Sequence, residues 1–208
     1  MTERAELRQS HWQNVYREKA ENQVSWFQET PAISLELIEA VHPKFDSAIV
    51  DIGGGASRLV DRLAREGYRD LTVLDVSENA IAMARARMGE PAEAVKWIVA
   101  DVTQWEPTRR YDLWHDRAAF HFLTQAPDRN AYVECLASAL RPGEHAIIGT
   151  FAMDGPERCS GLPVIRYDGA LLSATLGNAF ALVETRRHDH RTPMGGVQRF
   201  QFSIFRRQ

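Results

Sequence analysis

The sequence predicts a doubly wound α/β fold, in which a mostly parallel sheet carries helices on both faces. Three observations favour it: short apolar runs alternate with helical patterns, one run stops at three consecutive glycines, and several runs end on an aspartate. Strands that alternate with helices are typical of parallel sheets, because each helical crossover returns the chain to the same end of the sheet. The glycines at 53–55 mark the first turn from strand to helix.

Composition narrows the class of protein. A chain of 208 residues that is 44% hydrophobic can bury the core of one α/β domain, so we expect a single domain over residues 1–208. The net charge of −3 gives no basic field, and we expect neither a nucleic-acid nor a membrane partner. The start of the chain lacks the apolar segment of a signal peptide, and two cysteines favour a reducing compartment. We therefore expect a cytoplasmic location.

The first part of the chain differs from the rest. Residues 5–20 are predicted to form a polar helix that carries the aromatic residues Trp12 and Tyr16 but no core of its own. We expect residues 1–30 to form a helical lid over an α/β core at 31–208. Trp26 is a candidate wall of a binding site, although two adjacent aromatic residues are more often a packing anchor.

The core elements follow in order. A helix over 33–41 is followed by a strand at 49–52, a helix from Leu59 to Gly67 and a strand at 71–74. Further helices are expected at 77–88 and 128–140, further strands at 95–99, 111–115 and 145–151, and a turn at 141–143. The segments 180–184 and 197–205 read as strands with no helix between them, so we expect an antiparallel pair at the sheet edge.

The strongest signal is the spacing between the glycine turn and Asp75. An acidic residue about twenty residues after a nucleotide-binding glycine turn accepts hydrogen bonds from a ribose. Asp75 stands at that distance from Gly55, at the end of the next strand. The alternative for Asp75 and for Asp101, which ends the third strand, is an ordinary cap or turn aspartate.

These motifs resemble those of the class I S-adenosylmethionine-dependent methyltransferases. Residues 51–57 are similar to their motif Asp-x-Gly-x-Gly-x-Gly, with Ser57 in place of the last glycine, and Asp75, Asp101 and 140–143 fall where later motifs belong. The resemblance covers roughly residues 30–205. It implies a Rossmann-like, seven-stranded sheet with an antiparallel last strand, and S-adenosylmethionine as the cofactor.

The resemblance also assigns roles. The glycine turn would lie against the methionine part of the cofactor, Asp51 would help to hold its ammonium group, and Asp75 would accept from both ribose hydroxyls. Asp101 would bind the exocyclic amine of adenine. The predicted cofactor-binding residues are Asp51, Gly53, Gly54, Gly55, Asp75, Val76, Asp101 and Val102.

A dinucleotide-binding oxidoreductase is the rival within this kind of fold. Its Gly-x-Gly-x-x-Gly pattern, counted from Gly53, needs a small residue at position 58. Arg58 stands there, and counting from Gly55 fails because Ser57 is not glycine. We rank this rival low.

The acceptor site is less determined. His121 is the expected base or orienting group, with Asp116 as the second catalytic candidate, because both lie at or just beyond the end of the fourth strand. The alternative for His121 is a histidine packed between Phe120 and Phe122. The Asn/Asp-Pro-Pro-aromatic motif that many base methyltransferases carry at this place is absent, which argues against nucleic acid.

A turn-rich loop at 154–167 is expected to hang over the site. Arg166 would bind a substrate carboxylate or oxyanion and Tyr167 would close the pocket, so that Trp26, Arg166 and Tyr167 are the substrate candidates. Cys159 could bind a soft element such as arsenic, but enzymes of that kind use several cysteines. His188 and His190 would share one face of a strand, yet no third ligand is evident, and no metal is expected.

We therefore expect an S-adenosylmethionine-dependent methyltransferase that acts on a small molecule. A protein lysine methyltransferase is the alternative, and a non-catalytic cofactor-fold module that binds a partner is a second one. A closed apolar pocket beneath residues 154–167 would favour the small molecule, and a broad acidic groove would favour a protein lysine. The acceptor atom, and the choice between monomer and homodimer, stay open.

Overall fold

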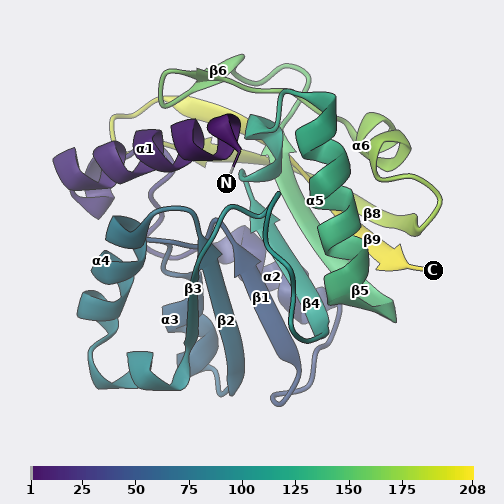
Figure 1. The fold of residues 1–208 in the computed structure, drawn as a ribbon, viewed down its shortest axis with the longest axis horizontal. Helices are drawn as coiled ribbons and strands as arrows, with labels where there is room; N and C mark the ends of the chain where they lie inside the picture. The colour runs from purple at the N-terminus through teal and green to yellow at the C-terminus, as the bar shows by residue number, and fades with distance from the viewer. Residues whose placement is uncertain (1) are drawn as a thin grey trace.

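A seven-stranded sheet runs through the centre of the protein (Figure 1). The structure, a computed structural model, describes residues 2–208, and the strand order is β3-β2-β1-β4-β5-β9-β8. The strands are β1 (Ala48–Ile52), β2 (Asp70–Asp75), β3 (Lys96–Val99), β4 (Tyr111–Arg117), β5 (Leu140–Phe151), β8 (Phe180–Arg191) and β9 (Val197–Arg207). The first five are parallel, and β9 is antiparallel to both of its neighbours. The predicted fold class, including its antiparallel last strand, is confirmed.

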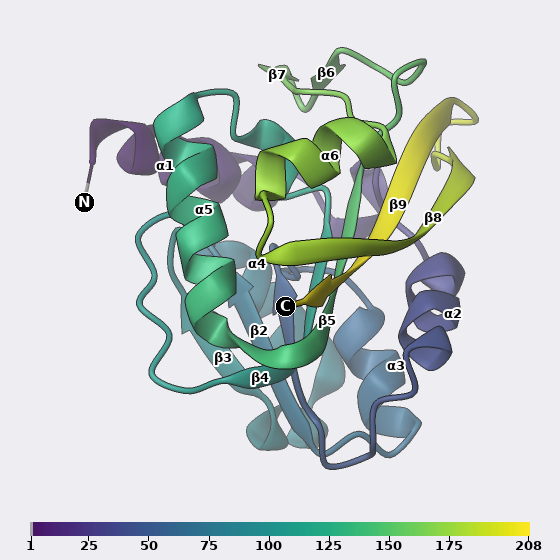
Figure 2. The same ribbon diagram turned by 90° about the vertical axis from the view of Figure 1, so that its right-hand side faces the viewer.

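Helices cover both faces of the sheet (Figure 2). On one face, α2 (Ala32–Ala40) and α3 (Leu59–Arg65) pack against one apolar cluster, while α5 (Ala126–Ala139) and α6 (Gly169–Leu176) pack against a second cluster on the other face. The strands between them are buried on both sides, and all five residues of β1 are buried. Such continuous apolar strands are what a parallel sheet between two helical layers requires.

The chain reverses direction across the sheet at β1. It runs outward from β1 through β2 to β3, and then returns to place β4 on the other side of β1, where Val50 pairs with both Thr72 and Trp114. The carboxyl ends of β1 and β4 therefore lie side by side, and the segments that follow them diverge. Open α/β sheets bind their ligands at such a switch point.

The helix α1 (Glu3–Glu18) lies across one end of the sheet (Figure 1). It packs beside α4 (Glu78–Met88), where the Gln13 side-chain oxygen accepts hydrogen bonds from the Ser77 hydroxyl and the Asn79 backbone, both at 3.0 Å. Ser77 also caps α4, as predicted, by accepting from the Ala80 backbone. A short hairpin of β6 (Arg158–Cys159) and β7 (Leu162–Pro163) lies on the same side of the sheet as α1.

Three elements differ from the sequence-based expectation. The turn expected at 141–143 is part of β5, because Leu140 already pairs with Tyr111. The pairing shifts register after Leu140, where Gly143 has a positive φ. The helix α6 was not expected; it is short, and Asp168 caps it by accepting from the Leu171 backbone. The strand β8 continues to Arg191, although most of its residues are not buried, because β9 pairs with it throughout.

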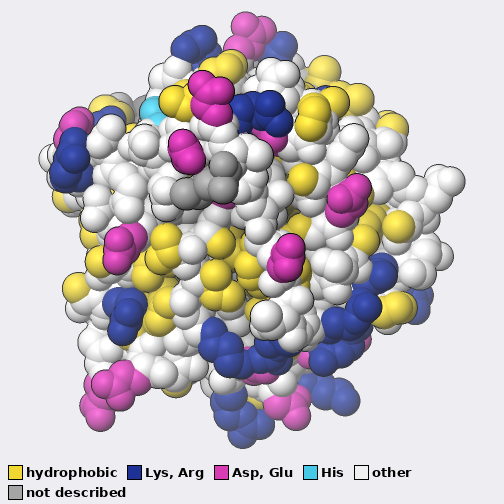
Figure 3. Space-filling view, in the orientation of Figure 1, with side chains coloured by type: hydrophobic (Ala, Val, Ile, Leu, Met, Phe, Trp, Pro, Cys, Tyr) yellow, Lys and Arg dark blue, Asp and Glu magenta, His cyan; other side chains and the backbone are white. Residues whose placement is uncertain are grey.

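The surface has apolar areas away from the sheet ends. Figure 3 shows hydrophobic side chains gathered over β3, among charged residues of both signs, and Val99 of that strand is exposed. None of the helices in residues 2–208 is long and apolar enough to cross a membrane.

Candidate active site

A cavity opens at the carboxyl ends of the parallel strands, beneath α1. It lies at the switch point between β1 and β4. The lining residues are Arg8, Trp12, Tyr16, Trp26, Ile52, Gly53, Leu74, Asp75, Val76, Ala100, Asp101, Val102, Arg117, Ala118, Ala119, Phe122, Leu123, Phe151, Cys159, Gln198 and Phe200. Six of the expected site residues are among them: Trp26, Gly53, Asp75, Val76, Asp101 and Val102.

The glycine turn makes room for two of the protein's own carboxylates and also forms part of the cavity wall. Gly53 has a φ of 65° and donates its N–H to the Leu74 carbonyl at 2.7 Å. A Cβ on Gly54 would come within 2.4 Å of Asp51 Oδ2, and one on Gly55 would come within 2.4 Å of Asp75 Oδ2. The bare backbone at 54 and 55 is therefore needed to let these two side chains pack against the turn.

Asp51 lies behind the glycine turn and does not line the cavity. Its Oδ1 lies 2.7 Å from His115 Nδ1, and the other ring nitrogen of His115 lies 2.9 Å from the Ser34 hydroxyl. All three residues are buried. In this arrangement Asp51 ties β1 to β4 and α2, and it supports the turn from below.

Asp75 reaches the cavity from the end of β2. One of its oxygens accepts a hydrogen bond from the Ser77 backbone at 2.7 Å, and its side chain is 5% exposed. Burial raises the pKa of Asp75 to about 7, and the nearby charge of Asp51 adds to this, against hydrogen bonds from the Ser77, Gly55 and Val76 backbones. Ligand hydroxyls that donate to this carboxylate would stabilise its charged form.

Asp101 is held by the N-terminal helix. Arg8 Nε lies 2.8 Å from Asp101 Oδ2, and its Nη1 lies 2.8 Å from Asp128 on α5. The backbone and hydroxyl of Thr103 donate to the other Asp101 oxygen at 2.9 and 2.7 Å. Arg8 thus fastens α1 to both the β3 end and α5, and it is itself part of the cavity wall.

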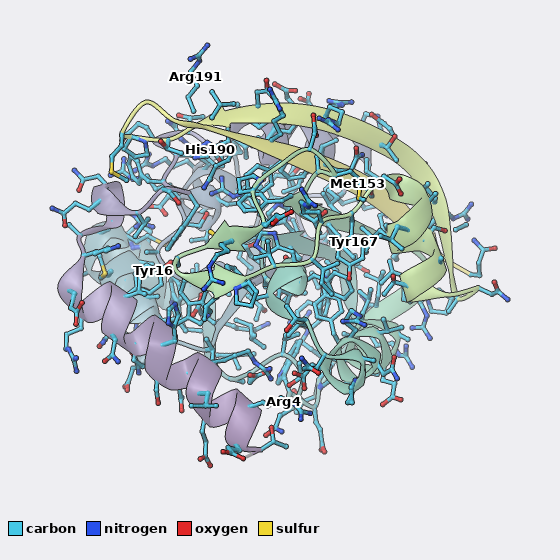
Figure 4. The ribbon with its side chains drawn as sticks, turned by 90° about the horizontal axis from the view of Figure 1, so that it is seen from above. Arg4, Tyr16, Met153, Tyr167, His190 and Arg191 are labelled. Carbon is cyan, nitrogen blue, oxygen red and sulfur yellow. The ribbon has the colours of Figure 1, made fainter. Side chains whose placement is uncertain are left out.

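Aromatic side chains form the far part of the cavity. Trp12 packs edge-to-face against Trp26 and Phe122, with ring centroids 5.6 and 5.0 Å apart. Tyr16 accepts a hydrogen bond from the Trp26 indole at 3.1 Å. On the sheet side of the cavity, Phe151 and Phe200 pack against each other with ring centroids 4.9 Å apart. Figure 4 shows Arg4 and Tyr16 toward opposite ends of α1, so the helix spans the mouth of the site.

Arg117 brings a positive charge into this aromatic region. It is the last residue of β4, and its guanidinium donates a hydrogen bond to the Trp26 carbonyl. None of the ion pairs within residues 2–208 includes Arg117, although Asp51 acts on it at longer range. Burial lowers the pKa of Arg117 to about 10, so it is still cationic at neutral pH. Sequence reasoning did not select Arg117; its place at a strand end was the available signal.

His121, the expected base, does not line the cavity. It is fully buried, its Nδ1 accepts a hydrogen bond from the Phe151 backbone at 3.2 Å, and burial lowers its pKa to about 3. The chain turns at Ala118, where φ is 73°, and this turn presents Phe122 to the cavity in place of His121. The geometry corresponds to the packing alternative for this residue.

Asp116 is also directed away from the cavity. It is fully buried, and it accepts hydrogen bonds from the Tyr132 hydroxyl at 2.7 Å and from the Ala119 and Phe120 backbones at 2.8 and 3.1 Å. Burial raises the pKa of Asp116 to about 6. These contacts hold the turn after β4, so Asp116 shapes the cavity wall from behind.

The two substrate candidates from the loop lie outside the cavity lining as well. Arg166 pairs with Glu157 at 3.0 Å and donates to the Gly155 carbonyl, which stabilises the loop itself. Tyr167 is 2% exposed and packs against Phe120 at 5.5 Å. The loop contributes Cys159 instead, whose pKa burial raises to about 11.

The two histidines of β8 lie in different environments. His190 is buried and its Nε2 lies 2.7 Å from the Ser25 carbonyl, whereas His188 is only partly buried. Within residues 2–208 no group of three His, Cys, Asp or Glu side chains is arranged to hold a metal ion.

Known proteins match this chain in sequence and in fold. Residues 49–143, which span β1 to the start of β5, match the family model described as a methyltransferase domain. This segment, a little under half of the chain, is similar to a methyltransferase domain. The resemblance to the class I S-adenosylmethionine-dependent methyltransferases, expected from the motifs, is confirmed.

Two curated relatives match part of the chain. Nodulation protein S of Rhizobium tropici is 32% identical over 101 residues, which are 49% of this chain and 42% of that protein. Ubiquinone biosynthesis O-methyltransferase of Serratia proteamaculans is 28% identical over 152 residues, which are 71% of this chain and 56% of that protein. This chain therefore matches only about half the length of these curated relatives.

A solved structure extends the match over the whole fold. The 1,6-didemethyltoxoflavin-N1-methyltransferase of Burkholderia thailandensis, solved with 1,6-didemethyltoxoflavin and S-adenosylhomocysteine bound, is 22% identical, with a TM-score of 0.76. The match covers 99% of this chain and 89% of that one. It shows a shared fold.

Proposed function

We propose that this protein transfers a methyl group from S-adenosylmethionine to a small-molecule nucleophile. The observation that carries the proposal is the cavity at the switch point, where Asp75 and Asp101 line one half and an aromatic cluster lines the other. We call these the cofactor half (Gly53, Asp75, Val76, Asp101, Val102) and the acceptor half (Trp12, Tyr16, Trp26, Arg117, Phe122, Phe151, Cys159, Gln198, Phe200).

The residues of the cofactor half fit the chemistry of this cofactor. The buried Asp75 carboxylate is placed to accept hydrogen bonds from ribose hydroxyls, and Asp101, which pairs with Arg8 at 2.8 Å, lies beside the place expected for the adenine amine. Val76 and Val102 supply apolar contact for an adenine ring. When bound, S-adenosylmethionine supplies an electrophilic methyl group. Asp51 and Gly54 would contribute indirectly, by shaping the turn.

The acceptor half favours a small molecule over a protein lysine. Its wall is mostly aromatic and is partly covered by α1, Trp26 and the loop that carries Cys159, so it forms a largely apolar pocket. A long lysine side chain would need an open, acidic groove that leads to the methyl group. The presence of Arg8, Trp12, Tyr16 and Trp26 in the cavity wall also supports the interpretation of residues 1–30 as a lid on a core at 31–208.

The protein's own contribution to the reaction is alignment and exclusion of water. Methyl transfer is an in-line displacement, so the walls must hold the acceptor atom opposite the sulfur. Arg8, through its bonds to Asp101 and Asp128, keeps α1 closed over the reacting groups. His121 and Asp116 act in this scheme as positioning residues behind the wall.

The proposal has a direct test. Calorimetry with S-adenosylhomocysteine should show binding, and labelled S-adenosylmethionine should then transfer its methyl group to members of a panel of thiols, amines, phenols and carboxylates. Binding without transfer to any small molecule, together with labelling of a protein substrate, would favour the lysine alternative. Absence of cofactor binding would favour a non-catalytic module.

Two further expectations accompany the proposal. A cytoplasmic location stays a prediction. So does the choice between monomer and homodimer, which light scattering of the purified protein would decide.

A further inference from the structure

The two halves of the cavity differ in how their charges are compensated. In the cofactor half Asp101 pairs with Arg8, whereas Arg117 is the cation of the acceptor half. Its guanidinium contacts a backbone carbonyl, and the ion pairs within residues 2–208 leave it without a carboxylate partner. A half-buried cation in an aromatic pocket is costly unless a ligand charge compensates it.

A second polar group in the acceptor half also lacks a partner. Gln198 lines the cavity and donates from its amide nitrogen to the Ser25 hydroxyl at 3.2 Å. Its amide oxygen is buried and accepts no hydrogen bond from residues 2–208. An unpaired buried acceptor is unfavourable, and a ligand N–H or O–H would satisfy it.

The acceptor half contains no base that is active at neutral pH. Its titratable side chains in residues 2–208 are Tyr16, Arg117 and Cys159. Burial raises the pKa of Tyr16 well above its ordinary value and that of Cys159 to about 11, so both are protonated. His121 is separated from the cavity. An acceptor must therefore arrive with its lone pair available.

We infer that the acceptor half binds a planar aromatic or heteroaromatic anion that also carries an N–H or O–H donor. Arg117 pairs with the negative charge, the Gln198 oxygen accepts from the donor, and Trp12, Trp26 and Phe122 hold the ring. The lone pair of the anion forms the new bond to the methyl carbon as the carbon–sulfur bond breaks and its electron pair stays on sulfur. No proton has to be removed, and this inference deepens the proposed function, on which it rests.

The test uses matched probe sets with the full chain saturated by S-adenosylhomocysteine. On benzene, pyridine and pyrimidine rings, each set contains a hydroxy-acid, its neutral carboxamide and its aminomethyl cation, with trans-4-hydroxycyclohexanecarboxylate as the non-planar acid. Binding is followed by calorimetry. We expect the aromatic acids to bind at least tenfold more tightly than the amides, cations and saturated acid.

Variants then assign the preference to its residues. Arg117→Met should abolish the acid preference, Arg117→Lys should keep it with weaker binding, and Arg191→Met, on a side chain that projects from the end of β8 into solvent (Figure 4), should change nothing. Gln198→Leu should weaken binding of the aromatic hydroxy-acids but not of the matching acids without the hydroxyl group, which are added as donor-free probes. The lysine variant keeps the charge, so it separates loss of the ion pair from loss of folding.

Outcomes for the two proposals are distinguishable. If S-adenosylhomocysteine does not bind, the proposed function fails first. If it binds but amides or cations equal the acids, or none of the probes binds, the assignment of an aromatic anion is overturned while the methyltransferase proposal stands.

Discussion

The cofactor half and the acceptor half of the cavity are built in different ways. In the cofactor half, short backbone segments at the ends of β1 and β2 place Asp75 beside the glycine turn, and the sequence carries a recognisable pattern of spacing. In the acceptor half, side chains from α1, β4, β5, β6, β9 and the segments around Trp26 and Phe122 converge from positions as far apart as Trp12 and Phe200. Local spacing predicts the first region, and only tertiary packing reveals the second.

The difference extends to charge. In the cofactor half Asp101 is paired with Arg8, so Asp75 is the carboxylate without a cation beside it, whereas the Arg117 guanidinium of the acceptor half has no carboxylate partner within residues 2–208 and suits an anionic acceptor. Variants in one half should therefore leave the ligand of the other half largely unaffected.

The largest effect should come from Asp75. Asp75→Ala removes a buried carboxylate that we expect to accept two hydrogen bonds from ribose, and should lower S-adenosylhomocysteine affinity at least a hundredfold, or by about 3 kcal/mol. Calorimetry would measure the change. Asp70→Ala, at the opposite end of β2 where Asp70 pairs with Lys96 and Arg109, should leave affinity within about twofold. Unchanged affinity in Asp75→Ala would remove the ribose assignment.

A smaller effect, on the rate of cofactor release, is expected from the residue that holds α1 in place. Arg8→Met breaks the bonds that tie α1 to Asp101 and Asp128, and should speed release of S-adenosylhomocysteine about tenfold. Stopped-flow fluorescence of the nearby tryptophans can follow release. Arg17→Met is the matched control, because Arg17 is also on α1 but is exposed and pairs with Glu18 of the same helix. Equal release rates in all three proteins would show that Arg8 does not hold the lid.

Cofactor affinity should also depend on pH. The pKa of Asp75 in the free protein is raised to about 7, and donation from ribose hydroxyls lowers it in the complex. Affinity should be constant above about pH 7.5 and fall by up to tenfold for each pH unit below 7, because a proton must leave before the ligand binds. In Asp75→Asn this slope should disappear; a slope that persists there would assign the titration to another group.

The smallest effect is expected at His121. An asparagine at this position can still accept from the Phe151 backbone, so His121→Asn should keep turnover within about twofold while lowering the melting temperature by a few degrees. Turnover would be measured with an acceptor found in the panel. A loss above a hundredfold with normal cofactor binding would restore His121 as a base.

Much of the fold follows from sequence because its signals are local. Apolar runs, the Ser77 cap and the glycine turn lie within a few residues of the structure they predict, and the alternation of strands and helices fixes the parallel sheet. The turn at 141–143 was misjudged because its Arg-Pro-Gly composition favours a turn, whereas pairing with Tyr111 keeps it in β5.

The acceptor site could be predicted only in part. Trp26 was among the substrate candidates, and the polar helix with Trp12 and Tyr16 was noted, but the direction of each side chain depends on the turn at Ala118. That turn decides that Arg117 and Phe122 reach the cavity while Asp116 and His121 stay behind it. A positive φ at a residue other than glycine leaves no signature in the sequence.

The most direct test of the two-halves account is titration of S-adenosylhomocysteine into Asp75→Ala and Arg117→Met, beside the wild-type protein. We expect at least a hundredfold loss of affinity in the first variant and less than a twofold change in the second. Similar losses in both variants would contradict the division of the cavity into a cofactor half and an acceptor half.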